Sequence, residues 1–507
     1  MRKINFIYIV LIAAILVSCN DFLSERPSKS SDIVPSTVED MESILAGMWR
    51  EDCISPNLVY GGGDIDLNAE LEKRISGAYS VEVVQGATWE REFSGTNKDY
   101  MWMYRYQNIF RSNLVFFYID KITATPSQVA MIKSEASFRR ALSYMELLTV
   151  YTLPYCNDNL NELGLPLTTT TGFDYSLERA SIKDTYDFIE KDIIEALKIT
   201  VELKNKFGQG SVYRVTSAAA NALAARFYLM KHNYVNAKKY AEAALAKYGV
   251  ENIMDYNQIG YSSRVDKGTI TIDGKVIDFE VKYPNTQFGY DYTNNWTEDY
   301  FLGCASSTFS YGFSTDMIPS QAHINCFSED GNRDMDARWK YFYVKNYGYL
   351  NNKPIDIHYY MVNANRNYTI TVPEMLLTIA ECEARVGDYN KAIALVNQLR
   401  LKRIDSAGKI NLTATSKEEA IGIVIRERRR EMGPIKRLFD VRRYNSNEYA
   451  GDDVTIEQNF YNYTPAGITV SGEIKKYELK PGDRRYAAMI PECDILAGKG
   501  QLKQNTY

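Results

Sequence analysis

Two stretches of this sequence, residues 60–98 and 255–371, combine aromatic with polar side chains and lack a helical period. The second stretch holds fourteen of the 39 tyrosines. Indole and phenol rings can stack on the apolar faces of sugar rings at little entropic cost, while neighbouring amides and charged groups bond to the hydroxyls. The alternative is that the rings only pack long loops onto the rest of the fold. The sequence predicts a ligand site in these stretches, with five candidate residues: Trp89, Asn97, Tyr290, Tyr292 and Trp296.

The histidines and cysteines offer no catalytic pattern. His232, His323 and His358 do not have the spacing of a zinc-protease motif. The sequence also lacks a nucleophile elbow, a phosphate-binding loop and a dinucleotide-binding fingerprint. No CxxC pair is present, and Cys304 with Cys326 is the only plausible local disulfide pair, which we expect to stay unpaired. We therefore expect no enzymatic activity, no cofactor and no metal.

Two groups of nearby carboxylates could be posed as the acid pair of a glycosidase. They are Asp64 with Asp66, and Asp330 with Asp334 and Asp336. In a chain with 64 acidic residues such groups arise by chance. The segment 330–334 also hints at a calcium loop, but it lacks the glutamate that an EF-hand has at its twelfth position. We expect a turn there.

An arginine-rich helix is expected at residues 416–432, where a Ser-x-x-Glu capping box precedes a helical stripe. Clustered arginines invite a nucleic-acid interpretation, but the net charge of −5 argues against such a partner. Glu427 with Arg430, and Arg428 with Glu431, stand three residues apart and can pair. Arg428 falls on the apolar stripe, where a guanidinium needs a carboxylate. These features favour a structural ion-pair network.

The first residues are typical of an export signal. A basic start is followed by an apolar run at residues 7–17, which is too short to span a membrane, and then by Ser18-Cys19. A small residue before a cysteine is typical of a bacterial lipobox, in which the thiol is acylated; an ordinary cleaved signal is the alternative. The sequence predicts a signal peptide at residues 1–18, a lipid that anchors the chain to a membrane through Cys19, and a polar tether at 19–37.

The candidate residues need a scaffold, and the sequence predicts a helical one. From Val372 onward, apolar residues recur with a helical period on both sides of the turn at Gly387. The same pattern surrounds Asn233, which tolerates the left-handed conformation that glycine would supply. Helix pairs joined by such turns are typical of tetratricopeptide repeats. We expect helices within 38–250 and 372–445, a hairpin around Asp273-Gly274, loops at 60–98, and an irregular chain after residue 444.

With these residues in view, the chain resembles the SusD/RagB family, the surface lipoproteins of Bacteroidota nutrient-uptake systems, over nearly its whole length. The most specific matches are residues 373–381 (Pro-Glu-Met-Leu-Leu-Thr-Ile-Ala-Glu) and residues 426–443, which begin Arg-Glu-Arg-Arg-Arg-Glu and end Leu-Phe-Asp-Val-Arg-Arg. The chain departs from the family pattern at Gly433-Pro434 and at Thr506, where Pro-Gly is usual.

The resemblance implies a mostly α-helical, tetratricopeptide-like scaffold with long irregular loops and a few short β-hairpins. It implies one domain at residues 38–507, with its ligand face mainly at 60–98 and 255–371. It also implies a non-enzymatic lid, exposed at the cell surface, on a SusC-like TonB-dependent outer-membrane transporter. Such a lid captures oligosaccharides and delivers them for uptake. The alternatives are the same lid with a peptide or another nutrient as ligand, a glycoside hydrolase, or a purely structural adaptor.

Overall fold

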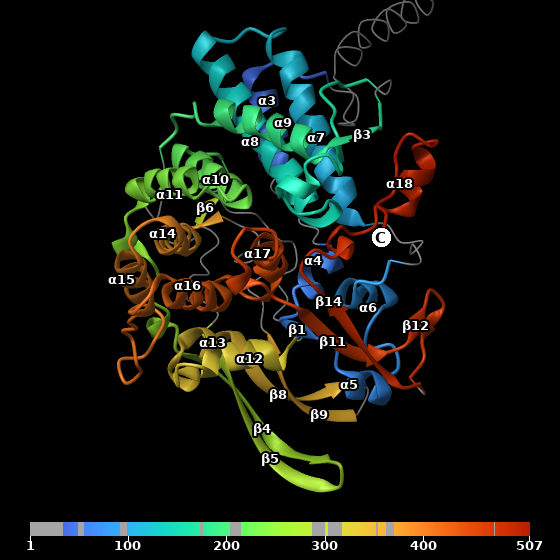
Figure 1. Cartoon of the computed structure of the whole chain (residues 1–507), viewed down its shortest axis with the longest axis vertical. Coiled ribbons are helices and arrows are strands. Elements are labelled where there is room, and N and C mark those ends of the chain that lie inside the picture. Colours follow the sequence, from blue (N-terminus) through green and yellow to red (C-terminus); the bar gives the residue numbers. More distant parts are fainter. Residues whose placement is uncertain are drawn as a thin grey trace, which may run out of the picture.

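The structure is a computed structural model, and it is mostly helical with small two-stranded antiparallel sheets (Figure 1). This confirms the predicted fold class. None of the helices it describes is both long and apolar enough to cross a membrane. The described residues are 34–48, 55–91, 99–172, 176–202, 214–285, 300–302, 317–350, 353–360, 370–470 and 472–507.

The first helical group lies at the top of Figure 1. It consists of α3 (Val38–Gly47), α7 (Tyr100–Ile119), α8 (Pro126–Tyr151) and α9 (Ile182–Ala196). The start of α8 is a capping box, because the Thr125 hydroxyl accepts from the Gln128 amide at 3.3 Å and the Gln128 side chain accepts from the Thr125 amide at 2.9 Å.

The two predicted helix hairpins lie side by side at the left of Figure 1, below the first helical group. They are α10 (Ser217–Met230) with α11 (Tyr234–Tyr248), and α14 (Val372–Val386) with α15 (Tyr389–Arg400), and α16 (Lys417–Met432) packs against the second hairpin. Alanines at 218, 219, 222, 237 and 241 are fully buried, which lets the helices approach closely. The expected left-handed role of Asn233 is wrong, because His232 takes that conformation (φ 56°) and Asn233 caps α11 instead.

The predicted hairpin around Asp273-Gly274 is confirmed and is longer than expected. It consists of β4 (Tyr261–Ile272) and β5 (Lys275–Pro284), and both turn residues have positive φ (50° and 77°), as a two-residue hairpin turn of this kind requires. The hairpin projects from the lower end of the molecule in Figure 1. A second hairpin, β8 (Tyr343–Leu350) with β9 (Lys353–Tyr360), lies beside its base.

The expected loop at residues 60–98 is partly helical. It contains α5 (Ala69–Arg74) and α6 (Val81–Thr88), and α4 (Pro56–Tyr60) precedes it. These helices are too short to display a period, but each begins at a side-chain cap: Ser55, Asn68 or Ser80.

The expectation of an irregular chain after residue 444 is also wrong in part. There β11 (Ile456–Tyr461) pairs with β14 (Ile474–Leu479), and the short helix α18 (Glu492–Ala497) follows.

Among the described residues, two large hydrophobic cores result, with three smaller clusters beside them. The larger joins the helices, and the second joins residues 60–89 to the elements around Trp339 and to the β11–β14 pair. The described parts of the two aromatic stretches therefore pack together and against the chain's end.

Candidate ligand-binding face

Four of the five candidate binding residues, Asn97, Tyr290, Tyr292 and Trp296, lie outside the described residues. Their binding role stays a prediction. The structure does describe both attachment points of the segment that carries the last three. On one side, β5 ends at Pro284, which pairs with Tyr261. On the other side, β6 (Tyr300–Leu302) pairs with β10 (Ile370–Thr371) at the start of α14.

The second attachment point is fixed to the scaffold. Thr371 is both the last residue of β10 and the cap of α14, where its hydroxyl accepts from the Glu374 amide at 3.3 Å. Glu374 is itself 1% exposed. The described residues that flank 286–299 are therefore attached to the long hairpin on one side and to a capped core helix on the other.

Trp89 is a core residue. Its side chain is 1% exposed, and its indole N–H donates to the Gly61 carbonyl at 3.0 Å. The residue ends α6 in a left-handed conformation (φ 56°), which directs the ring into the second core. An indole buried to this degree offers no face to a sugar, so the packing alternative holds for Trp89.

We predict that Trp89→Phe lowers the free energy of unfolding by about 2 kcal/mol, since the buried Gly61 carbonyl loses its donor and some core volume is lost. Urea denaturation followed by circular dichroism measures this. Ligand affinity is expected to stay unchanged. A large loss of affinity at unchanged stability would return Trp89 to the binding residues.

The other described rings of the 255–371 stretch mostly pack against one another. Trp339, 7% exposed, stacks on Tyr343 with ring centroids 4.7 Å apart and planes at 17°. Tyr261, at the base of the long hairpin, is 44% exposed and contacts Tyr341 edge to face at 5.3 Å. In this part of the stretch, packing accounts for most of the aromatic content.

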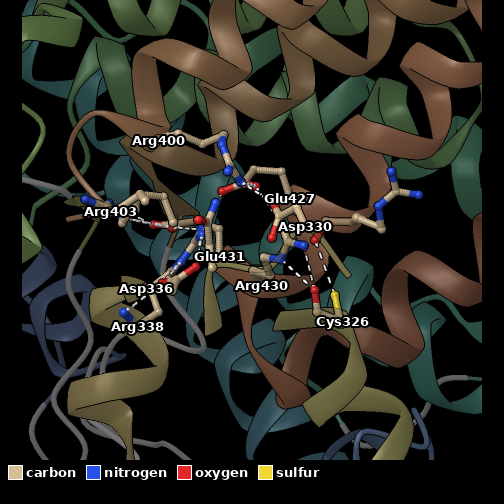
Figure 2. Close-up of polar contacts among 12 residues, drawn as sticks. Cys326, Asp330, Asp336, Arg338, Arg400, Arg403, Glu427, Arg430 and Glu431 are labelled. Carbon is tan, nitrogen blue, oxygen red and sulfur yellow. Dashed lines mark hydrogen bonds and ion pairs between the residues drawn. The ribbon is translucent and has the colours of Figure 1, made fainter. Parts of the chain in front are cut away.

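The arginine-rich helix α16 holds this stretch in place through buried ion pairs (Figure 2). Arg338 of α13 (Ala337–Phe342) bonds to Asp336 at 2.6 Å, to Glu427 at 2.7 Å and to Glu431 at 3.0 Å. Around this centre, four guanidinium groups face four carboxylates. They belong to Arg338, Arg400, Arg403 and Arg430, and to Asp330, Asp336, Glu427 and Glu431.

The predicted ion-pair network is thus confirmed, with one wrong pairing. Arg430 does bond to Glu427, at 3.0 Å. Glu431, however, pairs with Arg403 at 2.8 Å, while Arg428, fully buried, bonds to Asp440 at 2.9 Å. Burial favours the neutral form of Glu427, but the guanidinium groups of Arg338, Arg430 and Arg400 outweigh it and hold the pKa of that carboxyl well below its usual range.

Three of the suspected glycosidase carboxylates, Asp64, Asp330 and Asp336, are likewise held in ion pairs with arginines. Asp64 is fully buried and accepts from Arg429 at 2.9 Å and from His323 Nδ1 at 3.0 Å. Burial disfavours its charge, yet Arg429 and His323 outweigh burial and keep its pKa far below the ordinary value. The other ring nitrogen of His323 lies 2.5 Å from the Tyr343 hydroxyl. These contacts connect the segments that carry Asp64, His323 and Tyr343 to α16.

Within the described residues, no group of three or more His, Cys, Asp or Glu side chains could hold a metal ion. In the segment suspected of resembling a calcium loop, Asp330 pairs with Arg400 and Arg430, and the Asn332 amide donates to the Lys409 carbonyl at 2.7 Å. Among the described cysteines, Cys326 and Cys382 are buried free thiols.

Sequence reasoning missed a second buried cluster, at the start of α14. Glu374 accepts from Arg226 of α10 at 2.8 and 2.6 Å and from Lys436 at 2.9 Å. A glutamate in the first turn of an apolar helix was the available signal, since a buried carboxylate needs cationic partners. The partners themselves come from distant parts of the chain.

Two family models match the chain. A model described as "Starch-binding associating with outer membrane" matches residues 21–229, and the SusD family model matches residues 278–507. The two matches together account for most of the chain. Among curated proteins, none matches this sequence.

Several solved structures share the fold. A SusD superfamily protein from Bacteroides thetaiotaomicron is 19% identical, with a TM-score of 0.66 over 93% of this chain and 100% of that one. A SusD-like protein from Bacteroides fragilis is 17% identical, with a TM-score of 0.63 over 94% and 98%. A SusD-like carbohydrate binding protein from Bacteroides vulgatus is 16% identical, with a TM-score of 0.60 over 92% and 97%. At these low identities, the likeness shows a shared fold and nothing more specific.

Proposed function

Because this chain belongs to the SusD family, we propose that it binds oligosaccharides at the cell surface and delivers them to a SusC-like TonB-dependent transporter. In this proposal Cys19 carries the lipid that anchors the chain in the outer membrane. Capture requires stacking and hydrogen bonding and no covalent chemistry, so the protein acts as a binding lid rather than as an enzyme.

The observation that supports the proposal is that the described residues on both sides of 286–299 are attached to the scaffold. These flanking residues belong to the β4–β5 hairpin and to the β6–β10 pair, and β10 leads directly into the capped core helix α14. The segment itself carries Tyr290, Tyr292 and Trp296 among asparagines and an aspartate. Attachment at both ends limits the conformations open to a chain segment, so less conformational freedom is lost when the segment binds a ligand. Asn97, in the neighbouring stretch, is proposed to bond to sugar hydroxyls.

We predict that Trp296→Ala weakens oligosaccharide binding about tenfold, or ~1.4 kcal/mol, because one ring face is lost from the stack. Isothermal titration calorimetry would compare the wild type and the variant against oligosaccharides from starch, xylan, mannan and pectin. Phe117→Ala is the matched control, since Phe117 is an exposed ring on α7, which forms neither attachment point of the segment, and its removal should leave the affinity unchanged.

The same panel separates the rival functions. Short peptides are included in the panel. If peptides bind and sugars do not, the ligand is a peptide and the proposed lid role stays. Chain length of each polysaccharide is followed over a long incubation, and shortening would identify a hydrolase. The absence of any bound sugar, or equal affinity of wild type and Trp296→Ala, contradicts the proposal.

A further inference from the structure

Helix α7 carries aromatic side chains on its exposed side. Six apolar or aromatic residues recur there with a helical period, which places them along one side of the helix. They are Tyr100, Met103, Tyr104, Phe110, Leu114 and Phe117. The rings of Tyr100, Phe110 and Phe117 are 54%, 41% and 48% exposed, and the other three side chains are partly exposed. We call this set the α7 stripe.

The other side of α7 is buried in the scaffold. Trp102, Ile109 and Val115 are at most 4% exposed, and α7 packs against α8 and α3. The helix lies at the right of the first helical group in Figure 1 and forms neither attachment point of residues 286–299. A surface helix normally turns polar residues outward, so an apolar outer side indicates a contact with another surface.

The charge along α7 is positive. Residues Tyr100–Ile119 include no acidic side chain, although the whole chain has a net charge of −5. The acidic residues that flank the helix, Asp99 and Asp120, are already bonded to neighbouring side chains. Lys121 is exposed just beyond the helix, 3.0 Å from the centroid of the Phe117 ring, and forms no ion pair with a described residue. Rings beside a free ammonium match a layer of anionic lipid headgroups.

The size of the stripe argues against a protein partner. A helix of 20 residues is about 30 Å long and about 10 Å wide, so its exposed side covers about 300 Å². A stable protein interface buries about 800 Å² on each partner. A lipid surface needs no complementary shape, and a helix with rings on one side can lie in it along its whole length. The area therefore favours a lipid surface over a second copy or another protein.

The proposed lipid anchor is within reach of the stripe. Cys19 precedes Val34, the first described residue, by 15 residues, which span at most about 50 Å. The next element, α3, packs Met41 and Leu45 into one cluster with Val115 of α7. A lipid on Cys19 would hold this helical group near the membrane and raise the effective concentration of lipid around the stripe.

We propose that the α7 stripe docks on a lipid surface with anionic headgroups, with its rings at headgroup level and Lys121 against the lipid phosphates. Docking would give the anchored protein one orientation on the membrane, with α7 against the lipid. This deepens the proposed function, on which it rests for the lipid at Cys19.

The first test identifies what contacts the stripe. The acylated mature protein is placed in vesicles of phosphatidylcholine with a minority of phosphatidylglycerol, and a photoreactive p-benzoylphenylalanine replaces Phe110. Val235, 71% exposed at the start of α11, carries the same group in the matched control. Mass spectrometry is expected to find lipid adducts about tenfold more often at position 110 than at position 235. The same pair is then irradiated in intact cells, where lipid is again the expected adduct.

The second test measures the stripe without the anchor. The mature protein with Cys19→Ser is sedimented with the same vesicles. Phe110→Gln combined with Phe117→Gln is expected to lower the bound-to-free ratio about tenfold, while Val235→Gln leaves it unchanged. Lys121→Gln is expected to lower it about fivefold on these vesicles and to have no effect on pure phosphatidylcholine. Melting temperatures establish that each variant is folded.

Four results would overturn the inference: equal lipid adducts at positions 110 and 235, adducts with a second copy or another protein in place of lipid, an unchanged bound fraction in the double variant, or an unchanged one in Lys121→Gln. Oligosaccharide calorimetry needs no vesicles, and a mass spectrum shows whether Cys19 is acylated. Failure of the stripe to dock is thus distinguishable from failure of the proposed function.

Discussion

Glu427→Gln is expected to lower the free energy of unfolding by about 3–5 kcal/mol. The glutamate is fully buried and bonds to Arg338 at 2.7 Å, to Arg400 at 2.9 Å and to Arg430 at 3.0 Å. Glutamine keeps the shape and removes the charge, which leaves four buried guanidinium groups with three carboxylates. Domains are stable by only about 5–15 kcal/mol, so the loss is a large fraction of the total.

The matched control is Glu457→Gln. Glu457 pairs with Lys476 between β11 and β14, and both side chains are 50% exposed. An exposed pair contributes little, so this change should stay within about 1 kcal/mol of the wild type. Urea denaturation of both variants decides the matter. Equal stability of Glu427→Gln and Glu457→Gln would mean that the buried network does not hold the fold together.

The same substitution should also release one part of the molecule more than the rest. Arg338 belongs to α13, and its pairs with Glu427 and Glu431 attach that element to α16. In Glu427→Gln, backbone amides around residues 333–345 are expected to exchange with deuterium faster than those of α14. A uniform increase over the whole chain would argue against this local role.

Acidification from pH 7 to pH 5 is expected to cost about 2 kcal/mol of stability through His232 alone. Burial, reinforced by the nearby positive charges of Arg443 and Arg385, lowers the pKa of His232 to about 4, whereas the unfolded chain has the ordinary value of about 6.5. The unfolded state therefore binds the proton first. Stability from this group is fully present above pH 6.5 and is lost as the pH falls toward 4.

His232→Asn is the informative variant. Asparagine tolerates the left-handed conformation of residue 232 (φ 56°) and does not titrate. Its stability is expected to fall less between pH 7 and pH 5 than that of the wild type, by about 2 kcal/mol. Ser446→Ala is the control, because it removes a hydrogen-bond partner of the ring, 3.2 Å away, and leaves the histidine. Identical pH profiles for wild type and His232→Asn would contradict the neutral state of this partly buried ring.

The long helices could be predicted from sequence because each has enough turns to display its period. The 372–386 stripe and the turn at Gly387 indicated α14 and α15 directly. The helices α5 and α6 have 6 and 8 residues, so no period emerged, and the aromatic and glycine content of the region suggested a loop. Their caps, Asn68 and Ser80, were the signals that could have been used.

Partners in the buried networks could not be assigned from spacing. The requirement that Arg428 meet a carboxylate followed from its place on an apolar stripe, but its partner, Asp440, lies on another helix. Spacing suggested Glu431, which the fold instead places against Arg403 of the segment after α15. Local sequence shows that a buried charge needs compensation, while only the packed fold shows which residue provides it.

The candidate site, too, could be predicted from the sequence only in part. Composition indicated that the aromatic stretches could bind a ligand. Composition does not distinguish a ring exposed on a loop from a ring that packs the loop onto the fold. For Trp89 the difference came from one left-handed residue at the end of α6, which points the indole inward. Periodicity contains no information about that conformation.

A crystal structure of the protein with a bound oligosaccharide, chosen from the calorimetric panel, tests the central claim most directly. We expect a sugar ring within about 4 Å of the Trp296 indole, with Tyr290 or Tyr292 against the same ligand, between the ends of β5 and β6. A sugar bound elsewhere on the molecule, or residues 286–299 packed into the core with all three rings covered, would contradict the account.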